Sequence, residues 1–343
     1  MPDRRLPLDN GDARYSLYVP DSYRPERAYP LIICLHGAGF TGEAYLDRWR
    51  PRLGDDYLLA CPTIEGGAWW TGRAEAMVLA VLTAVQREYH IDLDRVVLTG
   101  MSNGGVGTFL IGLNHADRFA ALVPMAAAFP PGLAPLLDNA DNTPFYLIHG
   151  SKDQVMPVQY SRDVAAYLRK RGSAVVYREH DREHPMAGGH FFPKDELPDL
   201  VAWLGQQRRV PQPRAVVMVR DRYHAGRSYW VRIDAIDPSV ASFAASEFDS
   251  AESKKLQAGD YARLQARVEG NTITLTTERV RRFTLLLNRD VVDLERPIRV
   301  VGNGRVVFDG LVHPDARVLL TEVRRRPDPQ QLVLAEIPIN LDP

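Results

Sequence analysis

Over roughly the first two hundred residues, short continuous apolar runs alternate with longer amphipathic patterns. In Arg73–Tyr89, for example, Met77, Ala80, Val81 and Ala84 recur at helical spacing. Such alternation indicates an α/β fold with a mostly parallel sheet and helices on both faces. The predicted strands are Leu31–Leu35, Tyr57–Ala60, Val96–Thr99, Ala121–Met125, Phe145–His149 and Val175–Tyr177, and the predicted helices are Arg73–Tyr89, Gly104–Asn114, Pro157–Arg171 and Glu196–Gln207. The segment Arg14–Val19 predicts an antiparallel edge strand.

The pattern changes after the proline-containing segment 208–213, which suits a connection between domains. Beyond it, apolar and polar residues alternate with the period of a strand, and Asn303-Gly304 is typical of a type I′ hairpin turn. We therefore predict an α/β domain over 1–210 and an all-β sandwich over 213–343. The predicted strands of the second domain are Ser228–Ile233, Tyr261–Val268, Thr272–Thr276, Ile298–Val301 and Arg305–Phe308, with a hairpin loop at 269–271.

Charge and composition exclude several classes of function. The chain has 42 Lys and Arg against 43 Asp and Glu, so no overall positive field attracts a nucleic acid. Its two cysteines, Cys34 and Cys61, end apolar runs and are expected as buried thiols, with a pairing between them as the open alternative; two cysteines exclude a disulfide framework. The uncharged stretch Phe119–Leu137 contains prolines and is interpreted as a strand and a loop, not a membrane span. The first residues lack the apolar core of a secretory signal, so the cytoplasm is the default expectation.

The segment GMSNG at 100–104 lies between a predicted strand and a predicted helix. A Gly-x-Ser-x-Gly sequence at such a turn holds the serine in a strained backbone conformation with its hydroxyl exposed. Ser102 is therefore a candidate nucleophile. The structural alternative is a glycine-rich turn in which Ser102 only caps the helix.

A second glycine-rich loop, HGAG at 36–39, follows the predicted strand Leu31–Leu35. Backbone amides of this loop, chiefly that of Ala38 and also that of Gly39, would face the oxygen that becomes negative during acyl transfer. The amide of Asn103 would be the second donor. We interpret His36 as structural, because the loop acts through backbone groups. An ordinary glycine turn is the alternative.

Two later loops carry a carboxylate and several imidazoles. The segment HGSKDQVMP at 149–157 places Asp153 after a strand, where it can orient a histidine or, alternatively, cap the next helix. The segment GGHFFP at 188–193 places His190 on a flexible loop from which a general base can reach the serine. We prefer His190 to His184 and His180 as this base. The histidine spacing does not favour a zinc site.

With these four motifs in this order, the sequence resembles the α/β-hydrolase superfamily. The motifs are most similar to the phospholipase/carboxylesterase, feruloyl esterase and polyhydroxybutyrate depolymerase group, and to prolyl-oligopeptidase-like hydrolases. The resemblance covers residues 14–208. It implies that Ser102 attacks an acyl carbonyl, His190 transfers the proton and Asp153 orients the imidazole. The amides of Ala38 and Asn103 would hold the oxyanion, and neither a metal nor an organic cofactor is needed.

Aromatic residues on the surrounding loops are candidates for a substrate pocket, with packing in the core as the alternative. The candidates are Trp69, Trp70, Phe40, Phe129, Phe191 and Phe192, together with Gly39. We expect a serine esterase that acts on a small-molecule or polymer ester. A peptidase or amidase with the same residues is the main alternative, and a polymer-binding role for the β-rich domain is another.

Overall fold

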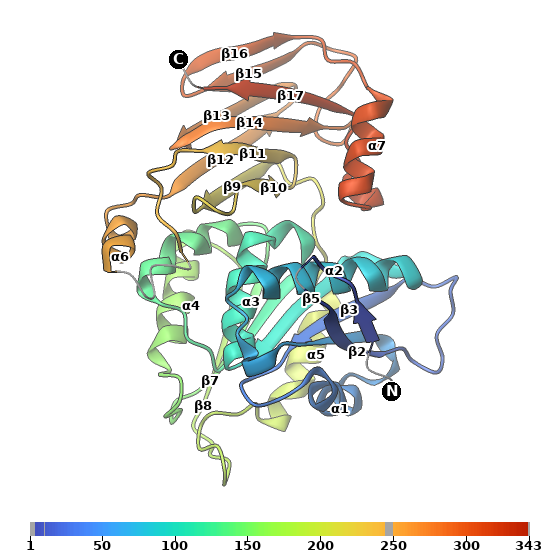
Figure 1. Ribbon diagram of the computed structural model, residues 1–343, viewed down its shortest axis with the longest axis vertical. Coiled ribbons are helices and arrows are strands. Elements are labelled where there is room, and N and C mark those ends of the chain that lie inside the picture. Colours follow the sequence, from blue (N-terminus) through green and yellow to red (C-terminus); the bar gives the residue numbers. More distant parts are fainter. Residues whose placement is uncertain (1–3, 10, 244–249, 342–343) are drawn as a thin grey trace. The chain divides into compact units, whose positions relative to one another are not determined.

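The computed structural model describes residues 4–9, 11–243 and 250–341. The chain forms two compact units, Met1–Arg209 and Val210–Pro343 (Figure 1). The boundary follows Arg209, whose guanidinium binds the Asp94 carboxylate at 2.8 Å and the Asp117 backbone carbonyl at 3.0 Å. Arg209 therefore belongs to the first unit.

Eight described strands of the first unit form one sheet in the order β1-β2-β4-β3-β5-β6-β7-β8. The pairings of β2 with β1 and β4 are antiparallel, and all the other pairings are parallel. The carboxyl ends of β3, β5, β7 and β8 consequently open at the same edge of the sheet. The strands are β1 Arg4–Leu6, β2 Ala13–Tyr18, β3 Tyr29–Leu35, β4 Leu58–Thr63, β5 Ile91–Met101, β6 Ala121–Met125, β7 Phe145–Gly150 and β8 Val175–His180.

Helices cover both faces of this sheet. Apolar side chains of α1 and α5 pack with strand residues in one core, and α2, α3 and α4 cover the opposite face (Figure 1). This confirms the predicted α/β arrangement. The helices are α1 Gly42–Leu53, α2 Gly72–Glu88, α3 Asn103–Asn114, α4 Gln159–Arg171 and α5 Leu197–Gln206.

Two features of this unit differ from the sequence analysis. The predicted edge strand Arg14–Val19 corresponds to β2, which lies inside the sheet because β1 pairs with its outer side. The helix α1 is absent from the predicted elements, because charged residues and Pro51 obscure its pattern. Its buried face nevertheless includes Tyr45 and Trp49 at four-residue spacing, as a helix on a sheet requires.

The second unit contains two sheets whose apolar side chains share one core. One has the order β10-β11-β14-β17, and the other has the order β16-β15-β13-β12-β9. The strands are β9 Ala215–Arg220, β10 Gly226–Ser228, β11 Val231–Ile236, β12 Ala262–Glu269, β13 Thr272–Glu278, β14 Val280–Leu287, β15 Ile298–Gly302, β16 Arg305–Gly310 and β17 Ala335–Asn340. The prediction that this unit is all-β is wrong, because it also contains the helices α6 Ser250–Gln257 and α7 Ala316–Arg325.

Turn chemistry accounts for the hairpins of this unit. Asn303 and Gly304 join β15 to β16 with φ values of 49° and 79°, as the predicted type I′ turn requires. The predicted single strand Ser228–Ile233 is wrong, since the chain reverses at Tyr229 between β10 and β11. Tyr229 adopts a φ of 53°, which an alternating apolar pattern does not reveal.

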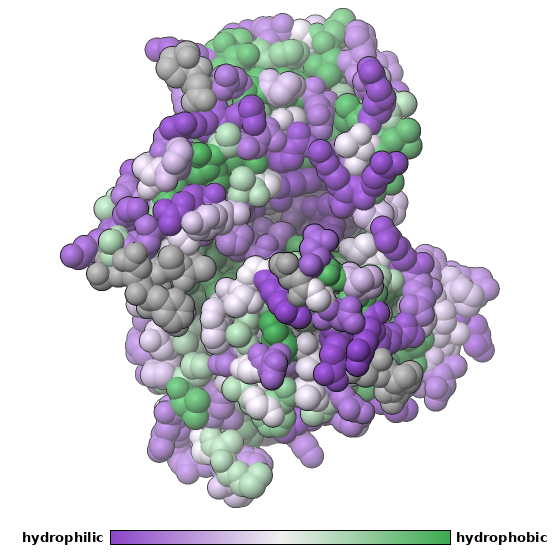
Figure 2. Space-filling view, in the orientation of Figure 1, coloured by the Kyte–Doolittle hydropathy of each residue, from purple (hydrophilic) through white to green (hydrophobic). Residues whose placement is uncertain are grey.

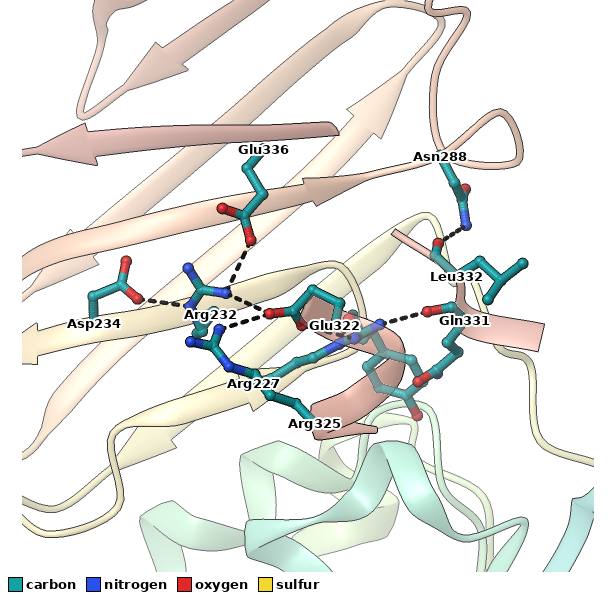
Figure 3. A network of polar contacts seen from close by, with 10 residues as sticks. Arg227, Arg232, Asp234, Asn288, Glu322, Arg325, Gln331, Leu332 and Glu336 are labelled. Atoms are coloured by element: carbon teal, nitrogen blue, oxygen red, sulfur yellow. Dashed lines mark hydrogen bonds and ion pairs between the residues drawn. The ribbon is translucent and has the colours of Figure 1, made fainter. Parts of the chain in front are cut away.

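An ion network attaches α7 to the sheet of β11 (Figure 3). The buried Glu322 carboxylate lies 3.1 Å from the Arg232 guanidinium and 2.8 Å from that of Arg325, with Arg227 at 3.4 Å. Arg232 also binds the carboxylate of Glu336 at 3.1 Å. Because the buried Glu322 carboxylate needs these cations around it, the network constrains the position of the helix.

On the face that Figure 2 shows, hydrophilic and hydrophobic side chains are interspersed over the first unit. Among the described residues, no helix combines the length and the apolar character that crossing a membrane requires. Cys34 and Cys61 are buried free thiols, as expected.

Candidate active site

The turn from β5 to α3 holds Ser102 in a conformation that a side chain rarely adopts. Its φ and ψ are 58° and −126°, and such strain costs about 1–3 kcal/mol. The Ser102 amide donates to the Met125 carbonyl at 3.0 Å, which fixes the turn against β6. The hydroxyl makes no capping hydrogen bond with α3, so the capping alternative is wrong. The close packing needs Gly104, because a Cβ there would lie 2.1 Å from the Leu35 carbonyl oxygen.

The loop after β3 lies directly beside this serine. A Cβ placed on Gly37 would lie 3.5 Å from the Ser102 Cβ, and Ala38 borders the same cavity as Ser102. The Asn103 amide is the first of α3 and therefore has no acceptor within the helix. The two amides predicted as oxyanion donors thus lie in segments that meet at Ser102, the loop after β3 and the first turn of α3.

His36 fixes the base of this loop. Its Nδ1 donates to the Gly37 carbonyl at 2.8 Å, and its Nε2 accepts from the Ile64 amide at 3.1 Å. Burial lowers the pKa of His36, which favours the neutral ring that this bonding requires. His36 therefore has a structural role, as expected.

The loop after β7 uses both oxygens of the Asp153 carboxylate. Oδ1 accepts from the amides of Val155 and Met156 at 2.8 and 2.9 Å, and Oδ2 lies 2.7 Å from the Nδ1 of His190. The side chain has no exposed surface. The predicted alternative of a helix cap is wrong, because Val158 occupies the cap position of α4.

A second histidine also supports Asp153. The Nε2 atom of His149 lies 3.2 Å from Asp153 Oδ2 and donates to the Met156 carbonyl at 2.8 Å, and its Nδ1 lies 2.7 Å from the Ser161 hydroxyl. Burial by itself raises the pKa of Asp153. Hydrogen bonds from the two imidazoles and a backbone amide outweigh burial and hold that pKa well below its usual range. The carboxylate is therefore a permanent anion at neutral pH.

His190 lies between the buried acid and the open cavity. Gly189 permits the approach, since a Cβ there would lie 2.5 Å from the Asp153 amide nitrogen. Within the described residues, neither His190 Nε2 nor the Ser102 hydroxyl makes a hydrogen bond, and both side chains border the cavity. The direct serine–histidine hydrogen bond is thus not formed in this structure, as is common before a substrate is bound. His184 borders the cavity as well but does not contact Asp153.

The cavity has a volume of about 860 Å³, which suits a small organic molecule. Of the residues predicted to contact substrate, Phe40, Phe191 and Phe192 border it, and the other four do not. Trp69 is fully buried, and its indole Nε1 donates to the His36 carbonyl at 2.7 Å. Phe129 packs against Phe109 with ring centroids 4.9 Å apart. Both are therefore core residues, and Trp70 and Gly39 also lie outside the lining.

Sequence reasoning missed two contributions to the site. The helix α1 provides Tyr45, Arg48, Trp49 and Arg52 to the cavity wall, and its absence from the predicted elements hid them. The contact of His149 with Asp153 was not predicted either, although the four-residue spacing within a strand-to-loop segment was visible.

Comparison with known proteins finds partial similarity to feruloyl esterases. No profile of a known protein family matches the sequence. A probable feruloyl esterase C from Aspergillus terreus is 25% identical over 163 residues, 44% of this chain and 58% of that protein. Feruloyl esterase D from Neurospora crassa is 24% identical over 182 residues, 48% of this chain and 62% of that protein. The chain thus spans about three fifths of the length of these two relatives.

A solved structure extends the likeness to the fold. The crystal structure of a thermostable esterase superposes with a TM-score of 0.51 at 24% identity, over 60% of this chain and 63% of that one. The strand order and the strand-to-helix turn at Ser102 agree with this likeness. The first unit has an α/β-hydrolase fold. Dipeptidyl-peptidase 5 from Porphyromonas gingivalis is also similar to the chain, at 24% identity over 137 residues, 35% of this chain and 20% of that protein.

The buried hydrogen bond of Trp69 in the first unit predicts a stability difference between two neighbouring tryptophans. Trp69→Phe leaves the His36 carbonyl without its donor and should lower the free energy of unfolding by about 1–3 kcal/mol. Trp70→Phe, at the next and less buried position, should change it by less than about 0.5 kcal/mol. Urea unfolding measures both. Unchanged stability in Trp69→Phe would contradict the structural role.

The depressed pKa of Asp153 predicts a pH-dependent contribution to stability. Because the folded pKa lies below the unfolded value of about 3.9, the ionised group stabilises the fold above that pH. This stabilisation should disappear as the pH falls toward the folded pKa. The difference in unfolding free energy between wild type and Asp153→Asn should therefore shrink between about pH 4.5 and 2. A difference that grows toward acid pH would contradict this assignment.

Proposed function

We propose that the chain is a serine hydrolase that cleaves carboxylic esters through an acyl-enzyme intermediate. The observation that carries the proposal is the 2.7 Å hydrogen bond from His190 to the buried Asp153, beside a cavity that Ser102 also borders. The partial similarity of the chain to feruloyl esterases supports ester substrates.

In the proposed reaction, the Ser102 hydroxyl attacks the ester carbonyl and transfers its proton to Nε2 of His190. Asp153 keeps the proton on Nδ1, so Nε2 is available as the base, and the carboxylate stabilises the imidazolium that forms. The imidazolium then protonates the departing alcohol. A water molecule activated by the same histidine hydrolyses the acyl-serine and releases the acid.

The amides of Ala38 and Asn103 are proposed to stabilise the tetrahedral oxyanion. The Asn103 amide also lies at the amino end of α3, where the helix dipole favours negative charge. Removal of one such donor in other enzymes costs about 3 kcal/mol of barrier. This chemistry requires no metal or organic cofactor, and the described residues contain no cluster suited to a metal ion.

Replacement of the nucleophile tests the mechanism directly. Ser102→Ala should lower hydrolysis of 4-nitrophenyl butyrate by about a thousandfold or more, without unfolding the protein. A fluorophosphonate probe should label wild-type Ser102, as peptide mapping would show, and should not label the variant. A nearly normal rate in Ser102→Ala would remove this serine from the mechanism.

A paired histidine test separates the proposed base from its neighbour. His190→Ala should lower the rate to a similar extent, because no other described imidazole both contacts Asp153 and borders the cavity. His184→Ala should have a much smaller effect. Loss of activity only in His184→Ala would reverse the assignment.

The type of bond cleaved distinguishes an esterase from a peptidase with the same residues. We expect turnover of 4-nitrophenyl acetate and butyrate and little turnover of aminoacyl 4-nitroanilides under the same conditions. An amine leaving group must be protonated before it departs, which makes it the more demanding substrate. Hydrolysis of the anilides without hydrolysis of the esters would show that the chain is a peptidase.

A further inference from the structure

The cavity is lined by several positively charged side chains. Arg48 and Arg52 of α1 and Lys194, which precedes α5, all border the cavity with Ser102. None of the residues that border it is an aspartate or a glutamate. The cavity lining therefore contains three cationic side chains and no acidic residue.

These cations have no counter-charge in the described chain. Among the described residues, the side chains of Arg48, Arg52 and Lys194 make no ion pair and no hydrogen bond, and the two arginines contact aromatic rings. Other arginines of the same unit are paired, such as Arg162 with Glu179 at 2.6 Å. Arg52 is half-buried, and a guanidinium removed from water without an anion is unfavourable.

The positive charges of Arg48 and Arg52 also repel each other. They are four residues apart and thus lie on one face of α1, where like charges repel. Burial lowers the pKa of Arg52, and the charge of Arg48 lowers it further, although an arginine stays protonated in proteins. An anion bound between them would offset both unfavourable effects.

Aromatic side chains hold the guanidinium groups without occupying their donors. The Arg48 guanidinium lies 4.4 Å from the Phe40 ring centroid, and that of Arg52 lies 5.4 Å from the centroid of Phe192. Contact with a ring face leaves the N–H groups at the edge of a guanidinium available for hydrogen bonds. A carboxylate, phosphate or sulfate matches this planar set of donors.

We infer that this site selects esters that carry an anionic group, which binds at Arg52 and Arg48 while the ester carbonyl lies at Ser102. The inference rests on the proposed function and adds the substrate class to it. The aromatic rings beside the arginines give this part of the cavity an apolar wall, so the anion would be borne by an aromatic or aliphatic part of the ester.

Two matched pairs of esters test the inference on each side of the scissile bond. In the acyl pair, 4-nitrophenyl hexanoate is compared with mono-4-nitrophenyl adipate, which has the same number of carbons and a terminal carboxylate. In the alcohol pair, 4-acetoxybenzamide is compared with 4-acetoxybenzoate. In at least one pair, kcat/KM for the anionic ester should exceed that for the neutral ester by about 10- to 100-fold.

Variants of α1 assign this preference to a residue. Arg52→Gln should reduce the ratio of anionic to neutral kcat/KM toward one. Arg50→Gln is the matched control, because Arg50 lies on the same helix, stacks on Tyr18 at 4.8 Å and does not border the cavity. It should leave the ratio unchanged. If Arg52 only supported the packing of Trp49 and Phe192, Arg52→Gln would change both esters to the same extent.

Salt dependence in the wild-type protein gives a measurement that needs no variant. Raising NaCl from about 0.02 to 0.5 M should lower kcat/KM for the anionic ester and have little effect on the neutral ester. Equal kcat/KM within both pairs, or a preference that Arg52→Gln and salt leave unchanged, would overturn the inference. If none of the four esters were hydrolysed, the result would instead contradict the proposed ester hydrolysis, so the two failures are distinguishable.

Discussion

The buried carboxylate of Asp153 determines how the loops at the sheet edge fit together. It accepts two backbone amides of its own loop and contacts imidazoles from β7 and from the loop after β8. An anion without exposed surface is stable only when its oxygens are hydrogen-bonded, so the loops must converge on it. The parallel strands make the convergence possible, because the loops that follow β3, β5, β7 and β8 all leave the sheet at the same edge.

The sequence predicted those parts of the fold that have a local cause. Continuous apolar runs identified the parallel strands, and helical spacing identified α2 to α5, because both patterns record which faces are buried. The turn at Ser102 was also predictable, since glycines are required where backbone atoms come so close that a side chain would overlap them, as at Gly100 and Gly104. The contact between Asp153 and His190 followed from the order of motifs rather than from spacing, as 37 residues separate them.

The remaining features depend on tertiary contacts that a local pattern does not contain. Trp69 and Phe191 are both aromatic residues on loops, but only Phe191 borders the cavity, because the indole of Trp69 is satisfied by a buried carbonyl. Similarly, Tyr229 turns the chain at a position whose neighbours alternate like a strand. Which aromatic side chain packs and which one faces a cavity is decided by partners far away in the sequence.

The helix α1 contributes much of the cavity wall but none of the groups proposed to exchange protons or form bonds. The residues proposed for chemistry lie instead on loops that the sheet and Asp153 hold in place. Substitutions on the exposed turns of α1 can therefore redirect which molecules are accepted while the reaction itself is preserved. In this arrangement, α1 determines which substrates fit and the loops at the sheet edge carry out the reaction. During evolution the substrate range can therefore change while the catalytic residues stay the same.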